Sequence, residues 1–232
     1  HYIKKDIFYI RLNRPEARNA INRQMLQEVE EAFEQLLKNN KIKAVLIRGV
    51  GHNFSSGGDI AQMKKLSEEE AFHLSQYAQK VFMKIERSEI PTIAAIEGFA
   101  VGGGIELALT CDIRIGADNA SFKMPEAALG IIPGGAGGQR LIRQAGLHNS
   151  LYLLLAGDTI TAAEAIRMRF LQKIVPAENF DQAVEELLLN ISKAPTDVLK
   201  SIKKSLRNGY SLPFEQACHQ DSIVFSRLVT DR

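Results

Sequence analysis

Residues 91–115 read PTIAAIEGFAVGGGIELALTCDIRI and contain three expected elements in immediate succession. The run at 91–96 is almost wholly apolar, which is typical of a strand buried on both faces of a sheet. Residues 103–111 predict a short apolar helix, and residues 112–115 predict a second strand. A strand, a helix and a strand joined this closely form a right-handed crossover, so we expect the two strands to lie parallel in one sheet.

The same alternation extends toward the N-terminus. Residues 7–12 and the apolar run at 44–47 each predict a strand. Between them, residues 21–37 predict an amphipathic helix, because apolar side chains recur at helical spacing: Ile21, Met25, Leu26, Val29, Ala32, Phe33, Leu36 and Leu37. Residues 68–87 predict a further helix ahead of the strand at 91–96. Strands that alternate with helices in this way predict an α/β fold built on a parallel sheet.

Strand signals fade beyond about residue 137. The segments after it predict helices at 138–145, 149–156, 161–169, 179–192 and 195–208. Thr161 and Glu164 have the spacing of a capping box, which marks the sharpest helix start of this region. We therefore divide the chain into an α/β core, residues 1–137, and a helical region, residues 138–232.

The composition is that of an ordinary globular protein. The chain has 232 residues, of which 45% are hydrophobic and 24% charged, enough to bury a sizeable core. Its net charge of +2 is far below the positive charge typical of a dedicated nucleic-acid binder. Nucleic acid is therefore not an expected partner.

Cysteine usage and hydropathy indicate the compartment. Cys111 and Cys218 lie far apart in the chain, which argues against a disulfide framework and favours a reducing compartment. No apolar run reaches the ~18 residues that a membrane span needs. We expect a soluble cytoplasmic protein without membrane association, or a mitochondrial matrix protein if a transit peptide is missing from the sequence.

The turn Gly102–Gly104 and the carboxylate that follows it, Glu106, form the first candidate site. Glu106 is the only ionisable carboxylate in an apolar stretch, and burial of a lone carboxylate is costly unless it is paired or hydrogen-bonded. Glycines let a ligand approach the backbone closely, and free N–H groups at a helix start favour negative charge on that ligand. From this segment alone, a functional and a structural glutamate are equally good interpretations.

Two further segments favour the functional interpretation. Gly57 and Gly58 follow the strand at 44–47, and ligands bind at the carboxyl ends of strands in open α/β sheets. Two glycine turns after two strands can direct two N–H donors at one oxygen, the geometry of an oxyanion hole. Glu126 comes twenty residues after Glu106, beyond the strand predicted at 112–115, which can fold it back over Gly102–Gly104. Two carboxylates at one substrate divide acid and base roles, because their repulsion keeps a proton on one of them.

Motifs of other enzyme classes are absent from the sequence. It contains no phosphate-loop motif, no G-x-S-x-G elbow and no H-E-x-x-H pair. Its five histidines are scattered without ligand spacing, so no metal site is expected. No G-x-G-x-x-G opens a helix after the first strand, which argues against a dinucleotide cofactor. Cys111, at the end of an apolar helix, is interpreted as a core residue and not as a nucleophile.

Taken together, the segments 54–60, 98–112 and 125–140 resemble the crotonase superfamily of enoyl-CoA hydratases and isomerases. The resemblance begins at LNRPEARNA, residues 12–20, and continues to about Pro176 and more loosely to the end. It implies a stacked βαβ spiral core followed by a helical trimerisation region. Members usually form trimers or paired trimers, so a homotrimer or hexamer is expected. Members also usually continue past the position of Arg232, so residues 138–232 are expected to lack the extreme C-terminal segment.

The resemblance also implies roles for individual residues. The backbone N–H groups of Gly58 and Gly103 match the oxyanion hole of the family. Glu106 and Glu126 match the two glutamates that hydratases of the family use. The positions that match stretches lining the CoA site are Ala17, Arg18, Ser56, Gly57, Asp59 and Ile60. CoA is part of the substrate in this family, so no tightly bound cofactor is expected.

The implied reaction is addition of water across the C2=C3 double bond of a 2-enoyl-CoA thioester. Glu106 would position and deprotonate the water, and Glu126 would deliver a proton to C2. Alternatives within the same fold are an enoyl-CoA isomerase and a branched-chain hydratase of the methylglutaconyl type. A non-catalytic RNA-binding relative is the alternative from another class. The modest net charge and the lack of an aromatic and basic stripe argue against RNA binding.

Overall fold

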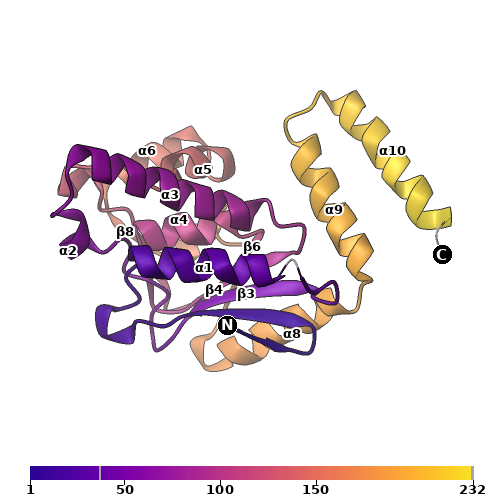
Figure 1. Cartoon of the computed structure of the whole chain (residues 1–232), viewed down its shortest axis with the longest axis horizontal. Coiled ribbons are helices and arrows are strands. Elements are labelled where there is room, and N and C mark those ends of the chain that lie inside the picture. Colours follow the sequence, from indigo (N-terminus) through magenta and orange to yellow (C-terminus); the bar gives the residue numbers. More distant parts are fainter. Residues whose placement is uncertain (37, 231–232) are drawn as a thin grey trace.

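The computed structural model describes residues 1–36 and 38–230 of the chain (Figure 1). Leu37, at the end of the helix expected over 21–37, lies outside the described residues, as do the last two residues of the expected helical region. Within the described part, none of the helices is long and apolar enough to span a membrane.

A six-stranded sheet forms the centre of the molecule, with the strand order β1-β2-β3-β4-β6-β9. Only β1 and β2 pair antiparallel, and every other neighbouring pair is parallel. Ile93 pairs with Ile113, which confirms the parallel crossover expected for residues 91–115. The strands are β1 (Tyr2–Lys4), β2 (Ile7–Leu12), β3 (Ala44–Gly49), β4 (Thr92–Ile96), β6 (Ile113–Ala117) and β9 (Lys173–Val175).

Helices cover both faces of this sheet, because successive side chains of each strand point to opposite faces. Phe8 and Ile10 of β2 belong to the larger core cluster, whereas Ile7 and Tyr9 belong to a separate one. Helix α8 packs on the smaller cluster, below the sheet in Figure 1. The helices that pack on the larger cluster lie above it and are α1 (Arg23–Leu36), α3 (Glu68–Glu86) and α4 (Gly103–Thr110), and α8 is Phe180–Ser192.

A second sheet of three strands lies beside the first, in the order β5-β7-β8. It contains β5 (Phe99–Val101), β7 (Ser121–Lys123) and β8 (Thr159–Thr161). These strands were not predicted, because a three-residue strand is too short to show a period of two. The second sheet matters for function, since β5 leads directly into the turn at Gly102 and β7 leads to Glu126.

Shorter helices connect these layers and close the fold. The capping box expected at Thr161 and Glu164 is present at the start of α7. These elements are η1 (Pro15–Ala17), α2 (Ile60–Met63), η2 (Ala127–Leu129), α5 (Gly137–Gln144), α6 (Leu147–Ala156), α7 (Ala162–Arg167) and η3 (Ala177–Asn179).

The prediction that only helices follow residue 137 is wrong. Strand β8 pairs with β7 of the small sheet, and β9 pairs with β6 at the edge of the large one. Both strands have three residues and lie between helical patterns, so local sequence does not separate them from loops. The residues after 137 therefore complete both sheets, and the division of the chain at that point stays a prediction.

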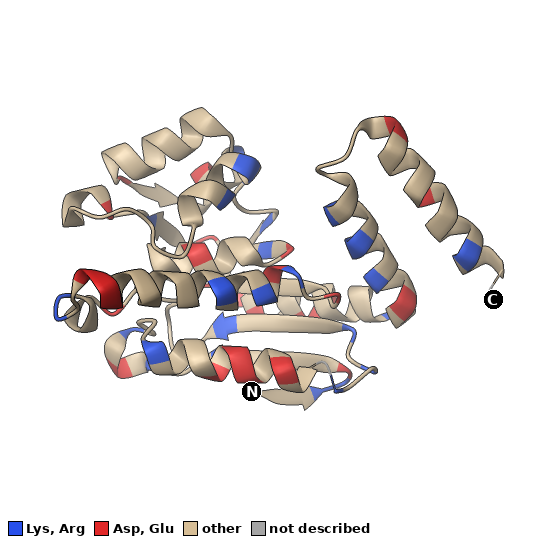
Figure 2. Cartoon of the chain, turned by 45° about the horizontal axis from the view of Figure 1, so that its top comes forward, with Lys and Arg blue, Asp and Glu red and all other residues tan. Residues whose placement is uncertain are grey.

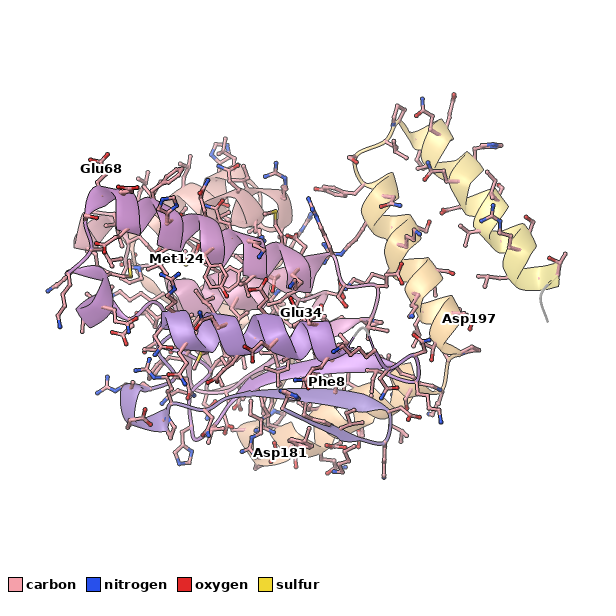
Figure 3. All side chains as sticks on the ribbon, viewed as in Figure 1. Phe8, Glu34, Glu68, Met124, Asp181 and Asp197 are labelled. Atoms are coloured by element: carbon pink, nitrogen blue, oxygen red, sulfur yellow. The ribbon has the colours of Figure 1, made fainter. Side chains whose placement is uncertain are left out.

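The last two helices form an arm that extends from the body of the molecule (Figure 1). It consists of α9 (Thr196–Gly209), which was predicted, and α10 (Phe214–Thr230), which was not. Helix α10 packs along α9 and contains no buried residue. Its side chains extend into open space over most of its surface (Figure 3).

Candidate active site

One cavity of about 480 Å³ brings together the carboxylates and the glycine turns that the sequence separates. Glu106 and Glu126 line it, and so do Gly58 and Gly103. The cavity lies between the glycine turns and the inner faces of α1, α2 and α3, and its remaining wall is mostly apolar. The four residues expected to do the chemistry therefore face one common space.

Glu106 lies in the first turn of α4 and is 5% exposed. Its Oε1 accepts a hydrogen bond from the backbone N–H of Gly137 at 2.7 Å. A Cβ on Gly137 would lie 2.6 Å from Cγ of Glu106, so this close contact requires glycine. Burial raises the pKa of Glu106, although the N–H groups of Gly137 and Gly135 and the charge of Arg140 oppose that effect.

Glu126 follows β7 and is 6% exposed. Its Oε2 is buried and has no hydrogen-bond partner within the described residues, an uncommon state for a buried carboxyl oxygen. Burial raises the pKa of Glu126 to about 7, and the nearby charge of Glu106 adds to the shift. A carboxyl group with this pKa can hold or release a proton near neutral pH, as an acid–base catalyst must.

The turns at Gly57–Gly58 and Gly102–Gly103 lie against each other. A Cβ on Gly103 would lie 3.1 Å from the backbone nitrogen of Gly58, so the two N–H groups are close neighbours. Within residues 1–36 and 38–230, neither N–H has a hydrogen-bond acceptor. The Gly103 N–H is free because it belongs to the first residue of α4. Two free donors side by side can hold one oxyanion.

Glycine is required on both sides of this pair of donors. Gly57 has a φ of +92°, and a Cβ there would lie 2.6 Å from the carbonyl oxygen of Val101. Gly102 has a φ of +45°, and a Cβ there would lie 2.8 Å from Oε1 of Glu126. Any other residue at either position would combine backbone strain with a clash. A bridge between Ser55 and Ala100 fixes the two turns relative to each other.

Residues 2–232 match the sequence model of the family described as enoyl-CoA hydratase/isomerase. The chain belongs to the enoyl-CoA hydratase/isomerase family. It is 37% identical to the short-chain-enoyl-CoA hydratase of Clostridium acetobutylicum over 218 residues, and this matched region covers 93% of this chain and 83% of that protein. It is 38% identical over 223 residues to the crotonyl-CoA hydratase of Syntrophomonas wolfei, covering 96% and 85%.

A solved structure shows the same fold. A putative enoyl-CoA hydratase from Thermobifida fusca in complex with acetoacetyl-CoA superposes with a TM-score of 0.91 at 29% identity, covering 100% of this chain and 94% of that one. These likenesses confirm the predicted crotonase-type α/β fold with C-terminal helices, and the predicted resemblance to enoyl-CoA hydratases. The chain is therefore an enzyme of the enoyl-CoA hydratase/isomerase family.

The residues that the family resemblance assigned to CoA fall into two groups. Ser56, Gly57, Asp59 and Ile60 line the cavity, whereas Ala17 and Arg18 do not. The carbonyl oxygens of Ala17 and Arg18 accept hydrogen bonds from the Ser56 hydroxyl at 3.2 Å and the Ser56 N–H at 2.9 Å. Asp59 also caps α2 and pairs with Arg14 at 3.2 Å, so part of its role is structural. Contact of these residues with CoA stays a prediction.

The sequence analysis did not predict the apolar wall of the cavity. The wall comes from helices α1–α3 and the segments around them: Leu26, Met63, Leu66, Ala71, Leu74, Ala78, Phe82, Leu129 and Ile131. On a helix, such residues have the same spacing as those of an ordinary core, so no local signal distinguishes them. A wall made of this many apolar side chains is suited to contact an apolar acyl chain.

The remaining reactive groups agree with the core interpretation. Cys111 is buried without a disulfide partner, and burial raises the pKa of its thiol to about 12, so it stays protonated. It is a core residue, as predicted. Among the described residues, no group of three or more His, Cys, Asp or Glu side chains is placed to hold a metal ion.

Proposed function

We propose that this enzyme adds water across the C2=C3 double bond of 2-enoyl-CoA thioesters. The observation that carries the proposal is one apolar cavity lined by two buried carboxylates and by two backbone N–H groups that have no acceptor among the described residues. The names of the relatives, a short-chain-enoyl-CoA hydratase and a crotonyl-CoA hydratase, support the same reaction.

The oxyanion hole is the electrostatic part of the mechanism. The thioester carbonyl oxygen accepts hydrogen bonds from the N–H groups of Gly58 and Gly103. Negative charge builds on that oxygen as a nucleophile adds to C3, and fixed donors in a water-poor site stabilise it strongly. Both donors are held by the fold before substrate binds, so no reorganisation is needed at the moment of reaction.

The two carboxylates move the protons. Glu106 takes a proton from water as the water oxygen bonds to C3, and the electron pair of the double bond shifts toward the thioester oxygen. Glu126 then gives its proton to C2, which restores the carbonyl group. Each turnover thus transfers one proton from the Glu126 side to the Glu106 side, and the pair must re-equilibrate afterward.

CoA is part of the substrate in this proposal, and no tightly bound cofactor takes part. The nucleotide portion would lie along Ser56, Gly57, Asp59 and Ile60, with Ala17 and Arg18 at the edge of the same segment. The acyl portion would extend along the apolar wall formed by α1–α3. The complex of a similar structure with acetoacetyl-CoA supports CoA as the handle.

A direct assay tests the proposal. Purified protein mixed with crotonyl-CoA should remove the ultraviolet absorbance of the conjugated enoyl thioester and form the 3-hydroxyacyl product. A 3-enoyl-CoA and a 3-methylglutaconyl-CoA, assayed beside it, test the isomerase and branched-chain alternatives. The isomerase test is included because one relative is named an enoyl-CoA isomerase/hydratase. Faster turnover of either alternative substrate would replace the proposed one.

The pH profile provides the next prediction. In each direction one carboxyl group donates a proton and the other accepts one. Hydration and dehydration therefore both require the carboxylate pair to hold a single proton. Burial raises the pKa of Glu126 to about 7, so we expect kcat/KM to fall as the pH rises through about 7 and that proton is lost. The acidic limb reflects Glu106, which must be ionised to accept a proton from water.

Initial rates in both directions, from about pH 5 to about pH 9, measure this profile. Hydration and dehydration should give bell-shaped curves with the same limbs. A rate that keeps rising through pH 7 in either direction would show that a proton held by the carboxylate pair is not required.

We also propose that the enzyme assembles as a homotrimer or a pair of trimers through the C-terminal arm. Large apolar side chains are exposed on the arm, including Phe214 at 83% and Phe225 at 69%. Exposed apolar surface of this kind marks an interaction site. Light scattering should give three or six times the chain mass, and Phe214→Asp with Phe225→Asp should lower it. Leu189→Asp, an exposed apolar position on α8, is the control, and a monomeric wild type would contradict the proposal.

A further inference from the structure

A buried arginine lies directly behind the loop that holds Glu106. Arg140 on α5 is 7% exposed, and its Nη1 donates a hydrogen bond to the carbonyl oxygen of Gly135 at 2.6 Å. Gly135 begins the loop in which the N–H of Gly137 binds Oε1 of Glu106 at 2.7 Å. One short loop therefore separates the guanidinium from the carboxylate, and Arg140 holds that loop on the side away from the substrate.

The loop has little freedom to shift without moving Glu106. A Cβ on Gly137 would lie 2.6 Å from Cγ of Glu106, and a Cβ on Gly135 would lie 2.6 Å from Cε2 of Phe82 and 3.2 Å from Cδ of Glu106. Between them, Ala136 has a φ of +66°, a left-handed conformation that is costly for a residue with a side chain. Strained residues persist only where surrounding contacts hold them on several sides.

Arg140 is itself fixed by an ion pair from another helix. Its Nε binds Oε2 of Glu86 on α3 at 3.1 Å. Oε1 of Glu86 also lies 3.4 Å from Nη1 of Arg207, which belongs to α9 and binds Asp112 at 2.7 Å. Helix α9 carries several of the Lys and Arg residues drawn in blue in Figure 2. The catalytic loop is thus joined to α3 and to the first helix of the C-terminal arm through Arg140.

We propose that Arg140 is a positioning residue of the hydration reaction: it clamps the Gly135–Gly137 loop and thereby holds the Glu106 carboxylate in line with the attacking water. The inference rests on the hydratase mechanism proposed above. The charged groups that face Glu106 are Glu126 across the cavity and Arg140 behind the loop, with Glu86 behind Arg140. The charge of Arg140 lowers the pKa of Glu106 against the effect of burial.

Arg140→Gln is the main test, assayed on the full chain with crotonyl-CoA. We expect kcat to fall about 10- to 100-fold with KM within about threefold of wild type, because misplacing a catalytic group affects the chemical step more than binding. Loss of the positive charge should raise the pKa of Glu106, so the acidic limb of the pH–rate profile should move to higher pH. A purely structural role would not move that limb.

Three more variants separate position from charge. Arg143→Gln is the matched control on the same helix, since Arg143 is exposed and donates to the carbonyl oxygen of Gln139, and it should behave as wild type. Arg140→Lys keeps the charge without the fork, so kcat should lie between the wild type and the glutamine variant, with the acidic limb unmoved. Glu86→Gln removes the counter-charge, so its acidic limb should move to lower pH, opposite to Arg140→Gln.

The outcomes are distinguishable. A wild type that does not hydrate overturns the proposed function, before any variant is compared. If the wild type hydrates, the clamp is overturned by wild-type kcat in Arg140→Gln, or by a loss of kcat with an unmoved acidic limb. If Arg140→Gln does not fold, Arg140→Lys and Glu86→Gln decide the matter, because the acidic limb should stay unmoved in the first and move to lower pH in the second. Equal acidic limbs in those two variants would then overturn the clamp.

Discussion

Glu106→Gln and Glu126→Gln should each reduce the rate of crotonyl-CoA hydration by about 10²–10⁴-fold, the loss typical of removing a general acid or base. Both substitutions replace one carboxyl oxygen with an amide and change the shape little. In Glu106→Gln, the remaining Oε1 can still accept the hydrogen bond from Gly137 N–H that holds the side chain in the wild type. The rate should therefore fall because proton transfer is lost and not because the cavity rearranges.

Steady-state kinetics and thermal unfolding, measured together, check this result. Glu89→Gln, at an exposed position outside the cavity, is the control and should hydrate at the wild-type rate. Two glutamine variants as fast as wild type would rule out the acid–base mechanism.

The unfolding data carry a further expectation for Glu126→Gln. The pKa of Glu126 in the folded state, about 7, lies above its value of 4.5 in an unperturbed chain. The folded state therefore binds this proton more tightly than the unfolded chain does. The stabilisation that results is complete below about pH 4.5 and is lost as the pH rises through about 7. The glutamine does not ionise, so the Tm difference between variant and wild type should move in favour of the variant over that window.

Gly103→Ala keeps the backbone N–H but displaces it, so we expect kcat to fall by up to about 10²–10³-fold, the loss typical of removing one oxyanion-hole donor. The added Cβ would lie 3.1 Å from the nitrogen of Gly58, closer than ordinary contacts, so the Gly58 turn would have to shift by a few tenths of an ångström. Alanine is a better helix former than glycine, so the substitution at the first position of α4 should not itself break the helix. The effect should therefore appear in catalysis more than in folding.

Gly138→Ala is the matched control for this substitution. Gly138 also lies in the first turn of a helix, and a Cβ there would make only ordinary contact with Leu154 at 3.5 Å. This variant should keep the wild-type kcat and equal or exceed the wild-type Tm. If Gly103→Ala kept full activity with an unchanged KM, the expected displacement of the two N–H groups by the added methyl group would be wrong.

The sequence predicted the elements that are long and strongly patterned. Strands β2, β3, β4 and β6 and the main helices up to α9 lie close to their expected positions. Strands β1, β5, β7, β8 and β9 were missed because each has only three residues. Helix α10 was also missed, and it contains no buried residue.

The candidate site followed the same division. Gly102–Gly104 and Glu106 are adjacent in the chain, so their placement at one helix start follows from local sequence. Gly58 and Glu126 join them through the pairing of β5 with β7 and the bridge from Ser55 to Ala100, which are contacts between distant segments. The order of the predicted strands suggested that these segments lie together. Only the fold shows that the two glycine nitrogens face one cavity.

By itself, the sequence determined that the chain is an α/β protein with a carboxylate behind a glycine turn, because periodicity and turn chemistry are local properties. Tertiary structure alone decided how the two carboxylates behave. The lack of a partner for Oε2 of Glu126 within the described residues, the apolar wall from α1–α3 and the hydrogen bond from Arg140 to Gly135 all depend on segments far apart in sequence. A pKa depends on burial and neighbouring charge in three dimensions, so it could not be predicted from the order of residues.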